Sequence, residues 1–197
     1  MRDPAALVVV EKCVATTGSP SDERKQQRVF KVVRMMSYLV PSFSSSSEPR
    51  TLSSKPYTKF TLEVADLHKK RMQFSKLLVD STGLGGPILE MCKGEGLPAF
   101  EMKLTSRSKE EVLFNLKALL AKQQVILPND ASLLANLNCI EAERTRNGRY
   151  SFDHMDGTHD DLAFALALAV WIGGKGAGTV VMMKKDADQN ASSWREQ

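Results

Sequence analysis

The run of residues from Leu162 to Ile172, LAFALALAVWI, contains no charged side chain. It is about half of the ~20 residues that a helix needs to cross a bilayer, so it does not predict a membrane span. Its apolar side chains would surround a helix on all sides, which predicts a helix buried inside a globular domain. The chain has 197 residues, 42% of them hydrophobic, which is enough for one domain with its own core.

Strand and helix patterns alternate along the rest of the chain. β-Branched and alternating apolar residues predict an opening pair of antiparallel strands at 5–10 and 28–38. Further strands are expected at 76–80, 99–104, 124–127, 139–144 and 149–152. Helices are expected from Lys59 to about Met72, at 88–92, at 106–120 and at 162–172. The inner face of the first helix is expected to include Leu62, Val64, Leu67 and Met72, and that of the third Leu113, Leu116, Leu119 and Leu120. The strands at 139–144 and 149–152 are expected to form a hairpin across the turn Arg146-Asn147-Gly148. This order predicts an α/β domain with a mixed sheet.

The expected domain covers residues 1–172. Within it, the low-complexity sequence SFSSSSEPRTLSSKP predicts a flexible loop at about 41–56. Residues 16–23 are rich in turn formers and predict the connection between the first two strands. Residues 173–197 are first glycine-rich and then polar, which predicts a loosely ordered tail.

The chain carries 27 Lys and Arg against 23 Asp and Glu, a net charge of +4. This excess permits an anionic partner such as nucleic acid without requiring one. Cys13, Cys92 and Cys139 are odd in number and form no CxxC pair, which predicts reduced, buried thiols rather than disulfides or a zinc site. No secretory leader pattern opens the sequence, so a cytoplasmic location is expected.

Asp80 ends the apolar segment LLVD and is followed by the turn STGLGG. At the carboxyl end of a strand, a carboxylate can face the crevice in which open α/β sheets bind ligands. It can equally cap the turn that follows it. The glycines match neither a P-loop, since no Gly-Lys-Ser/Thr follows, nor the dinucleotide fingerprint GxGxxG. ATP hydrolysis at this turn is therefore not expected.

His159, Asp160 and Asp161 come directly before the apolar run. The helix dipole stabilises an acidic residue at a helix N-terminus by roughly 0.3–1 kcal/mol. One Asp suffices for capping, so either both acids cap the helix beside a solvated histidine, or one of them has another role. Joined with Asp80, they would form a set of oxygen ligands suited to Mg²⁺ or Mn²⁺.

The segment Thr105–Lys109 opens the helix at 106–120 with hydroxyls and cations, which are groups that bind phosphate oxygens at a helix N-terminus. The same residues can also be a helix start capped by Ser106 or Ser108, with Lys109 exposed. The other two histidines carry no functional signal; His68 lies in a basic stretch and is expected to be solvated.

Four blocks in their order and spacing resemble the nuclease domain of phage terminase large subunits: LLVDSTGLGGPILE, LTSRSKEEVLFNLKALL, ILPND and YSFDHMDGTHDDLAFALALAVW. The resemblance covers roughly Arg28 to Ile172. It implies an RNase H-like fold, in which helices flank a mixed sheet and acidic residues gather at one sheet edge. It further implies a metal-dependent endonuclease domain that cuts concatemeric viral DNA during genome packaging, in the cytoplasm of the host cell.

The resemblance also implies roles for individual residues. The catalytic metal ligands, which would hold two Mg²⁺ or Mn²⁺ ions, would be Asp80, Asp160 and Asp161, with the direct ligand of the last two left open. The residues beside these ligands would be Asp3 and His159, and those contacting DNA would be Thr82, Ser108 and Lys109. Double-stranded DNA is the implied substrate. The terminase small subunit and the portal protein are implied partners of the full-length protein, and no membrane contact is implied.

The opening of the chain departs from the family pattern. Asp3-Pro4 and the strand after it are similar to the family's second Asp-Pro and the following strand. The strand that bears the first catalytic acid is therefore expected before Met1, as is an ATP-driven motor domain, and this chain is expected to cut DNA weakly or not at all. Two alternatives stay open: another RNase H-like nuclease, of the resolvase or transposase type, or an inactive prophage-remnant domain that binds DNA.

Overall fold

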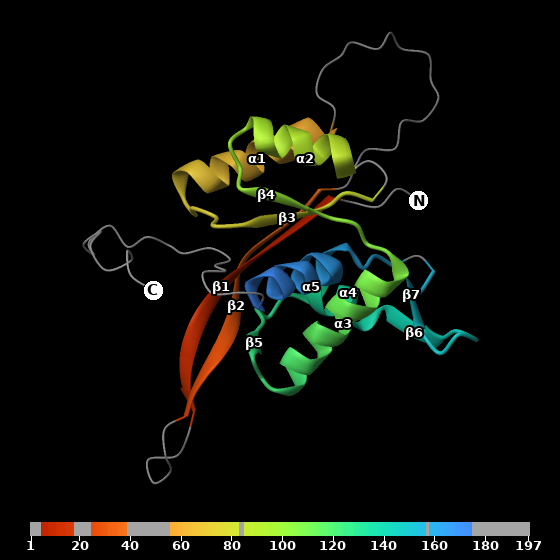
Figure 1. Ribbon diagram of the computed structural model, residues 1–197. Coiled ribbons are helices and arrows are strands. Elements are labelled where there is room, and N and C mark those ends of the chain that lie inside the picture. Colours follow the sequence, from red (N-terminus) through yellow and green to blue (C-terminus); the bar gives the residue numbers. More distant parts are fainter. Residues whose placement is uncertain (1–4, 18–24, 39–55, 83–84, 157, 175–197) are drawn as a thin grey trace, which may run out of the picture.

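The computed structural model describes residues 5–17, 25–38, 56–82, 85–156 and 158–174. A long antiparallel strand pair runs through the molecule, and the helices and shorter strands pack around part of it (Figure 1). Most of the expected 16–23 turn and 41–56 loop lie outside the described residues, as does the tail from 175 onwards. None of the described helices is long and apolar enough to cross a membrane.

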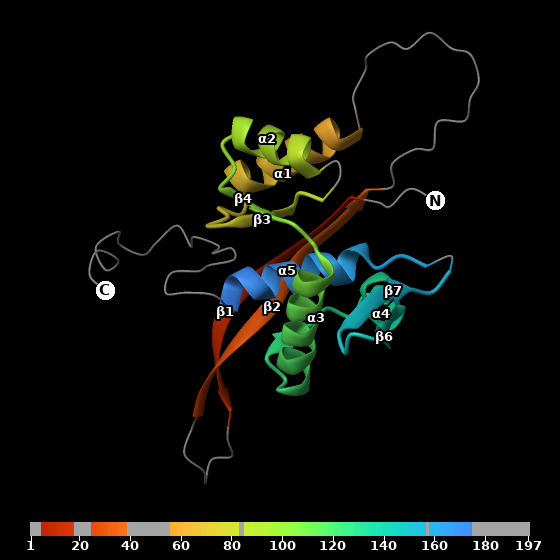
Figure 2. The same ribbon diagram turned by 45° about the vertical axis from the view of Figure 1, so that its right-hand side comes forward.

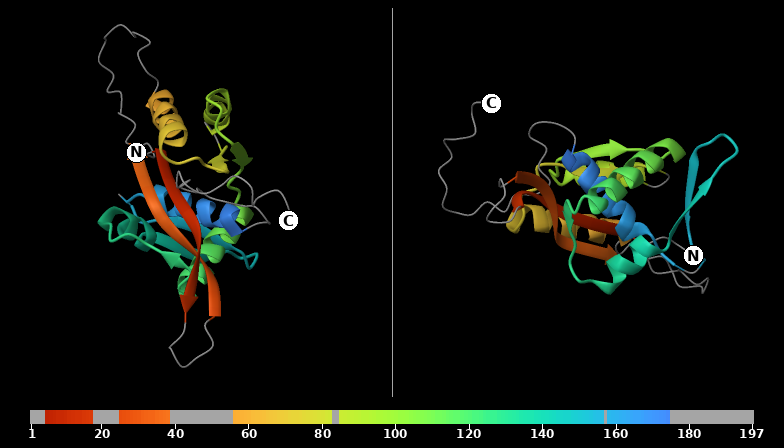
Figure 3. Two further views of the ribbon diagram at one scale, coloured as in Figure 1. Left: turned by 90° about the vertical axis from the view of Figure 1, so that its left-hand side faces the viewer. Right: turned by 90° about the horizontal axis from the view of Figure 1, so that it is seen from below.

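The predicted opening strands are confirmed and are longer than expected. β1 (Ala5–Thr17) pairs antiparallel with β2 (Lys25–Tyr38), with a register shift between Val9 and Val10. The short strand β5 (Val125–Ile126) joins β2 in parallel. Figure 3 shows the pair as a twisted ribbon, which is the twist that L-residues favour in strands. The β-branched side chains that predicted β1 form part of the core, and Val10 is fully buried.

A second sheet carries Asp80. β3 (Leu77–Asp80) and β4 (Ala99–Met102) pair in parallel, and helix α2 (Gly85–Gly94) makes the crossover that parallel strands require. Helix α1 (Pro56–Lys70) packs beside α2, above the two strands in Figure 1. The strand expected at 76–80 and the helix expected after the glycine turn are therefore confirmed.

Two details of α1 differ from expectation. It begins at Pro56, so the last residue of the expected loop is helical. Its buried face follows Phe60, Val64 and Leu67, which are spaced i, i+4 and i+7, whereas Leu62 is 50% exposed. The assignment of Leu62 to the inner face was wrong because that position lies about half a turn away from the stripe.

Helix α3 (Ser106–Ala121) starts from a different cap than expected. Thr105 is the N-cap: its Oγ1 accepts from the backbone N–H of Ser108, and the Ser108 side chain bonds the N–H of Thr105 in return. The prediction of Ser106 or Ser108 as N-cap was therefore wrong, because the N-cap lies one residue before Ser106 and three before Ser108. Leu113 and Leu116 lie on the buried face as predicted.

The segment after β5 contains a helix that no sequence pattern indicated. α4 (Ala131–Asn138) is capped by Asp130, whose side chain accepts from the backbone N–H of Leu133. β6 (Ile140–Arg144) and β7 (Tyr150–His154) then form the expected antiparallel hairpin.

Helix α5 (Asp161–Gly174) is the predicted buried helix, and it extends two residues beyond the predicted end. Figures 1 and 2 show it lying between the β1–β2 pair and α3, with α4 and the hairpin near its N-terminal end. Ala163, Leu166, Ala167 and Val170 have no exposed surface. The core therefore surrounds α5, as its apolar sequence requires.

The strands do not form one continuous sheet in the described part of the chain. There, β1 pairs with β2 alone and β3 pairs with β4 alone. One edge of β1 and one edge of β3 are thus without a neighbouring strand among the described residues.

Candidate active site

A cavity of about 540 Å³ lies between β1, β3 and α5. The strands contribute two stretches to its lining, Ala6–Val8 from β1 and Lys76–Asp80 at β3. Side chains of α1 and α2 line it as well, and α5 contributes a row of apolar residues together with Asp161. The three acids singled out in the sequence all line this cavity, namely Asp80, Asp160 and Asp161. Residues 80 positions apart in the chain therefore line the same cavity.

Asp80 caps the turn that follows it and also faces the cavity. Its Oδ1 accepts from the backbone N–H of Thr82 at 2.9 Å and from the Thr82 hydroxyl at 2.6 Å. The Thr82 hydroxyl in turn accepts from the N–H of Leu104 at 3.0 Å. Among the described residues, only Oδ1 of Asp80 takes part in these bonds. The two roles considered for Asp80 are therefore compatible, because the turn uses one carboxylate oxygen.

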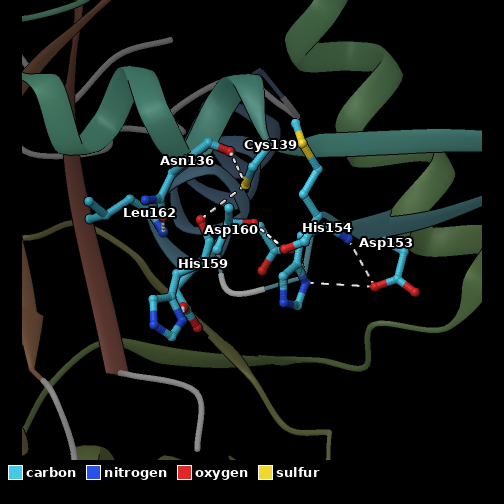
Figure 4. A network of polar contacts seen from close by, with 10 residues as sticks. Asn136, Cys139, Asp153, His154, His159, Asp160 and Leu162 are labelled. Carbon is cyan, nitrogen blue, oxygen red and sulfur yellow. Dashed lines mark hydrogen bonds and ion pairs between the residues drawn. The ribbon is translucent and has the colours of Figure 1, made fainter. Parts of the chain in front are cut away.

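Asp160 and Asp161 each lie beside a histidine. Nδ1 of His154 is 3.6 Å from Oδ2 of Asp160, and Nδ1 of His159 is 3.8 Å from Oδ2 of Asp161 (Figure 4). Each pair attracts only when the imidazole is protonated. Both carboxylate side chains are about one-fifth exposed, at 20% and 19%. Both acids of the lining are therefore largely buried, and His159 is partnered rather than fully solvated.

His154 and Asp153 are polar residues of the cavity that the sequence analysis did not identify. They stand at the end of β7, and Asp153 Oδ1 is 3.7 Å from Nδ1 of His154 (Figure 4). Both line the cavity, although the Asp153 side chain is 87% exposed. A signal was available: the hairpin was predicted correctly, and its second strand ends a few residues before Asp160.

The three residues expected to contact DNA differ in their surroundings. The Ser108 hydroxyl donates to the carbonyl of Lys103 at 2.7 Å and serves the helix cap. The Thr82 hydroxyl is shared between Asp80 and Leu104. Lys109 lines the cavity, with its Nζ 5.2 Å from the centre of the Phe164 ring, a favourable cation–π distance. Lys109 is the cationic residue among the three, and it lies where it can bind an anion at the cavity.

The remaining sequence assignments concern Asp3 and the cysteines. Asp3 lies outside the described residues. All three cysteines are unpaired, as predicted; Cys92 and Cys139 are buried, whereas Cys13 is only partly buried. Burial raises the pKa of the Cys92 thiol, which keeps it protonated at neutral pH.

The donor chemistry of the cavity fits a hard divalent cation, because carboxylate oxygens are the ligands that Mg²⁺ and Mn²⁺ prefer. The described residues contain no group of three His, Cys, Asp or Glu side chains close enough to hold a metal ion together. The carboxylate oxygens are therefore the right kind of ligand for such a cation. The described residues alone do not supply enough of them, close enough together, to bind it.

Part of the chain is similar in sequence to two phage terminase large subunits. No protein-family model matches the chain. The terminase large subunits of Thermus phage G20c and Thermus virus P23-45 are each 33% identical to it over 94 residues, which is 47% of this chain and 19% of theirs. The chain therefore spans about one-fifth of the length of these relatives.

Two solved structures have the same fold. The large terminase nuclease of phage G20c, with bound magnesium, aligns with a TM-score of 0.56 at 20% identity, over 85% of this chain and 81% of its own. The large terminase nuclease domain of Thermus phage P74-26 aligns with a TM-score of 0.55 at 17% identity, over 90% and 83%. Part of the chain is similar in sequence to phage terminase large subunits, and the chain has the fold of these nuclease domains. The RNase H-like α/β fold expected from the terminase resemblance is thereby confirmed.

Proposed function

We propose that this chain is the divalent-metal-dependent DNA endonuclease domain of a terminase large subunit, cutting concatemeric viral DNA during genome packaging. The observation that carries the proposal is that Asp80, Asp160 and Asp161 all line one cavity. The fold and the partial sequence similarity to terminase large subunits support it. The G20c nuclease was crystallised with magnesium and with cobalt, which supports a divalent metal here.

The proposed ligands are Asp80 together with Asp160, Asp161 or both, holding two Mg²⁺ or Mn²⁺ ions. Bound there, such ions would activate a water molecule and stabilise the leaving oxygen of the phosphodiester. Thr82 would orient the Asp80 carboxylate through the bonds to its Oδ1. A protonated His159 would restrain Asp161 through an ion pair, and Asp3 would lie beside the ligands.

Lys109 is proposed to hold a DNA phosphate at the cavity, with smaller contributions from Thr82 and Ser108. Contacts of this kind give sequence-independent affinity that falls as salt concentration rises. The proposed substrate is double-stranded DNA. In a full-length protein, the terminase small subunit and the portal would be partners, and the proposed location is the host cytoplasm.

The strand expected before Met1 is also a proposal, and the cavity supports it. β1 and β3, which each have one edge without a neighbouring strand among the described residues, both contribute residues to the cavity lining. Helices line it too, α1 and α2 on one side and α5 on the other. An extended strand placed there would join the two sheets and bring a carboxylate toward Asp80.

The test is metal-dependent nicking of supercoiled plasmid. The wild-type chain is expected to nick slowly in Mn²⁺ or Mg²⁺, and Asp80→Ala is expected to abolish the activity. Asp66→Asn removes an exposed carboxylate that pairs with Lys70 on α1, and it should leave nicking unchanged. Nicking by Asp80→Ala at the wild-type rate would place the active site elsewhere.

A second candidate is a DNA-binding domain that cannot cut. The incomplete set of carboxylates among the described residues favours it. It predicts salt-sensitive DNA binding, which a Lys109→Ala variant weakens, without nicking in any metal.

A further inference from the structure

The C-terminal end of α4 holds the backbone on both sides of the Asp160–Asp161 pair. The Oδ1 atom of Asn136 accepts from the N–H of Leu162 at 3.0 Å, and the Cys139 thiol donates to the carbonyl of His159 at 3.1 Å. Figure 4 shows these side chains reaching the turn from one helix end. The two acids thus lie between two anchor points that belong to the same element.

The Asn136 amide is fixed in orientation. Its Nδ2 donates to the carbonyl of Ser132 one turn earlier at 3.0 Å, so Oδ1 is the atom that faces Leu162. The N–H of Leu162 lies in the first turn of α5, where backbone donors have no partner inside the helix. Asn136 therefore caps α5 from a neighbouring helix, and Leu162 itself is buried.

Cys139 ties the same turn to the hairpin. Its side chain is buried, and its thiol also lies 3.3 Å from the carbonyl of Asn136. Its own carbonyl accepts from the N–H of Met155, the residue after β7, at 3.2 Å. The end of α4 therefore connects the acid pair with the segment that carries His154.

α4 is a firm support for these contacts. Asp130 caps its first turn, and Leu133 on its inner face has no exposed surface. Outer partners of metal ligands usually change metal affinity by about 10–100-fold when they are removed, because ligand orientation must be accurate to fractions of an ångström.

We propose that Asn136 and Cys139 are positioning residues, which hold the Asp160–Asp161 turn so that its carboxylates point into the cavity. The inference rests on the proposed function, because it assigns a purpose to a turn that would bind metal. It concerns backbone anchoring through uncharged side chains, so neither residue needs to touch metal or DNA.

The test compares two variants at Asn136 in protein free of DNA, with Mn²⁺ affinity measured by calorimetric titration. Asn136→Leu is close in size and removes the acceptor, and it should weaken Mn²⁺ binding by about tenfold or more. Asn136→Asp retains an acceptor oxygen and should restore affinity to near the wild-type value. Cys139→Ala and Cys139→Ser form the equivalent pair, since serine keeps a donor.

Leu133→Ala is the matched control for a merely structural role. It removes buried apolar contacts of α4 and should lower the melting temperature, yet it leaves both anchoring bonds in place. Wild-type Mn²⁺ affinity in Asn136→Leu, or an equal loss of affinity in Leu133→Ala, would overturn the proposal.

Amide hydrogen exchange separates this inference from the proposed function. The Leu162 amide should exchange faster in Asn136→Leu than in Asn136→Asp, because its acceptor is lost. If the wild-type chain binds no Mn²⁺, the proposed function fails, and anchoring by Asn136 still stands if this difference in exchange is observed. Equal exchange in the two variants refutes the anchoring.

Discussion

At the scale of single residues, His68 illustrates how one hydrogen bond changes the chemistry of a side chain. Its Nδ1 accepts from the backbone N–H of Phe74 at 2.8 Å, and its ring lies 5.1 Å from the Phe74 ring. Burial, with a smaller effect from the charge of Lys69, lowers the pKa of His68. The expectation of a solvated histidine was wrong because the chain turns back after α1 and brings Phe74 over it.

The lowered pKa of His68 predicts a stability that depends on pH. Between the folded-state pKa and the ordinary value of 6.5, the unfolded chain binds more protons than the folded one. The contribution of His68 is therefore fully present above pH 6.5 and is lost as pH falls through that window. Denaturant midpoints measured across this range should fall more steeply for the wild type than for His68→Gln. Parallel curves for the two proteins would contradict the assignment.

At the scale of helices and strands, the sequence predicted the elements whose pattern is local and strong. The apolar run predicted α5 because hydrophobic side chains on all sides leave no exposed position for that helix. The segment LLVD predicted β3 and placed Asp80 at its end for the same reason. α4 was missed because it is short, and Leu133 is its only fully buried side chain. Its anchoring by Asn136 and Cys139 depends on tertiary contacts that no local pattern reports.

The start of α3 gives a test at the same scale. Thr105, Ser106 and Ser108 all carry hydroxyls, and the structure gives the capping role to Thr105. Thr105→Ala should cost about 1 kcal/mol of unfolding free energy, because it leaves a first-turn N–H without its acceptor. Ser106→Ala removes a neighbouring exposed hydroxyl and should change stability by less than about 0.5 kcal/mol. Urea denaturation of both variants measures the difference, and equal effects would refute the assignment of the cap.

At the scale of the whole molecule, the two sheets and the cavity between them determine what the site can do. The sequence singled out three acids that line the same cavity, because strand ends and helix starts lie at sheet edges in this fold. It did not predict the histidine pairs, because His154 comes to Asp160 only through the bend between β7 and α5. Nor did it show that the described acids form no three-ligand cluster.

A polypeptide that includes the expected preceding strand should nick plasmid faster than residues 1–197 by more than about tenfold, since two-metal hydrolysis needs ligands on both sides of the phosphate. Plasmid nicking in Mn²⁺ by the two lengths, at equal DNA occupancy, measures the effect. Asp80→Ala in the longer polypeptide is the control and should be inactive. Equal rates for the two lengths would show that the carboxylates of 1–197 suffice.

The strand edges beside the cavity also bear on how this chain behaves in solution. A strand edge without a neighbour presents a row of backbone donors and acceptors, which is a template for pairing with another polypeptide. Here β1 and β3 each have such an edge among the described residues and both line the cavity, so an extended segment of another chain could pair with either strand. Concentrated preparations of residues 1–197 alone should accordingly be prone to self-association.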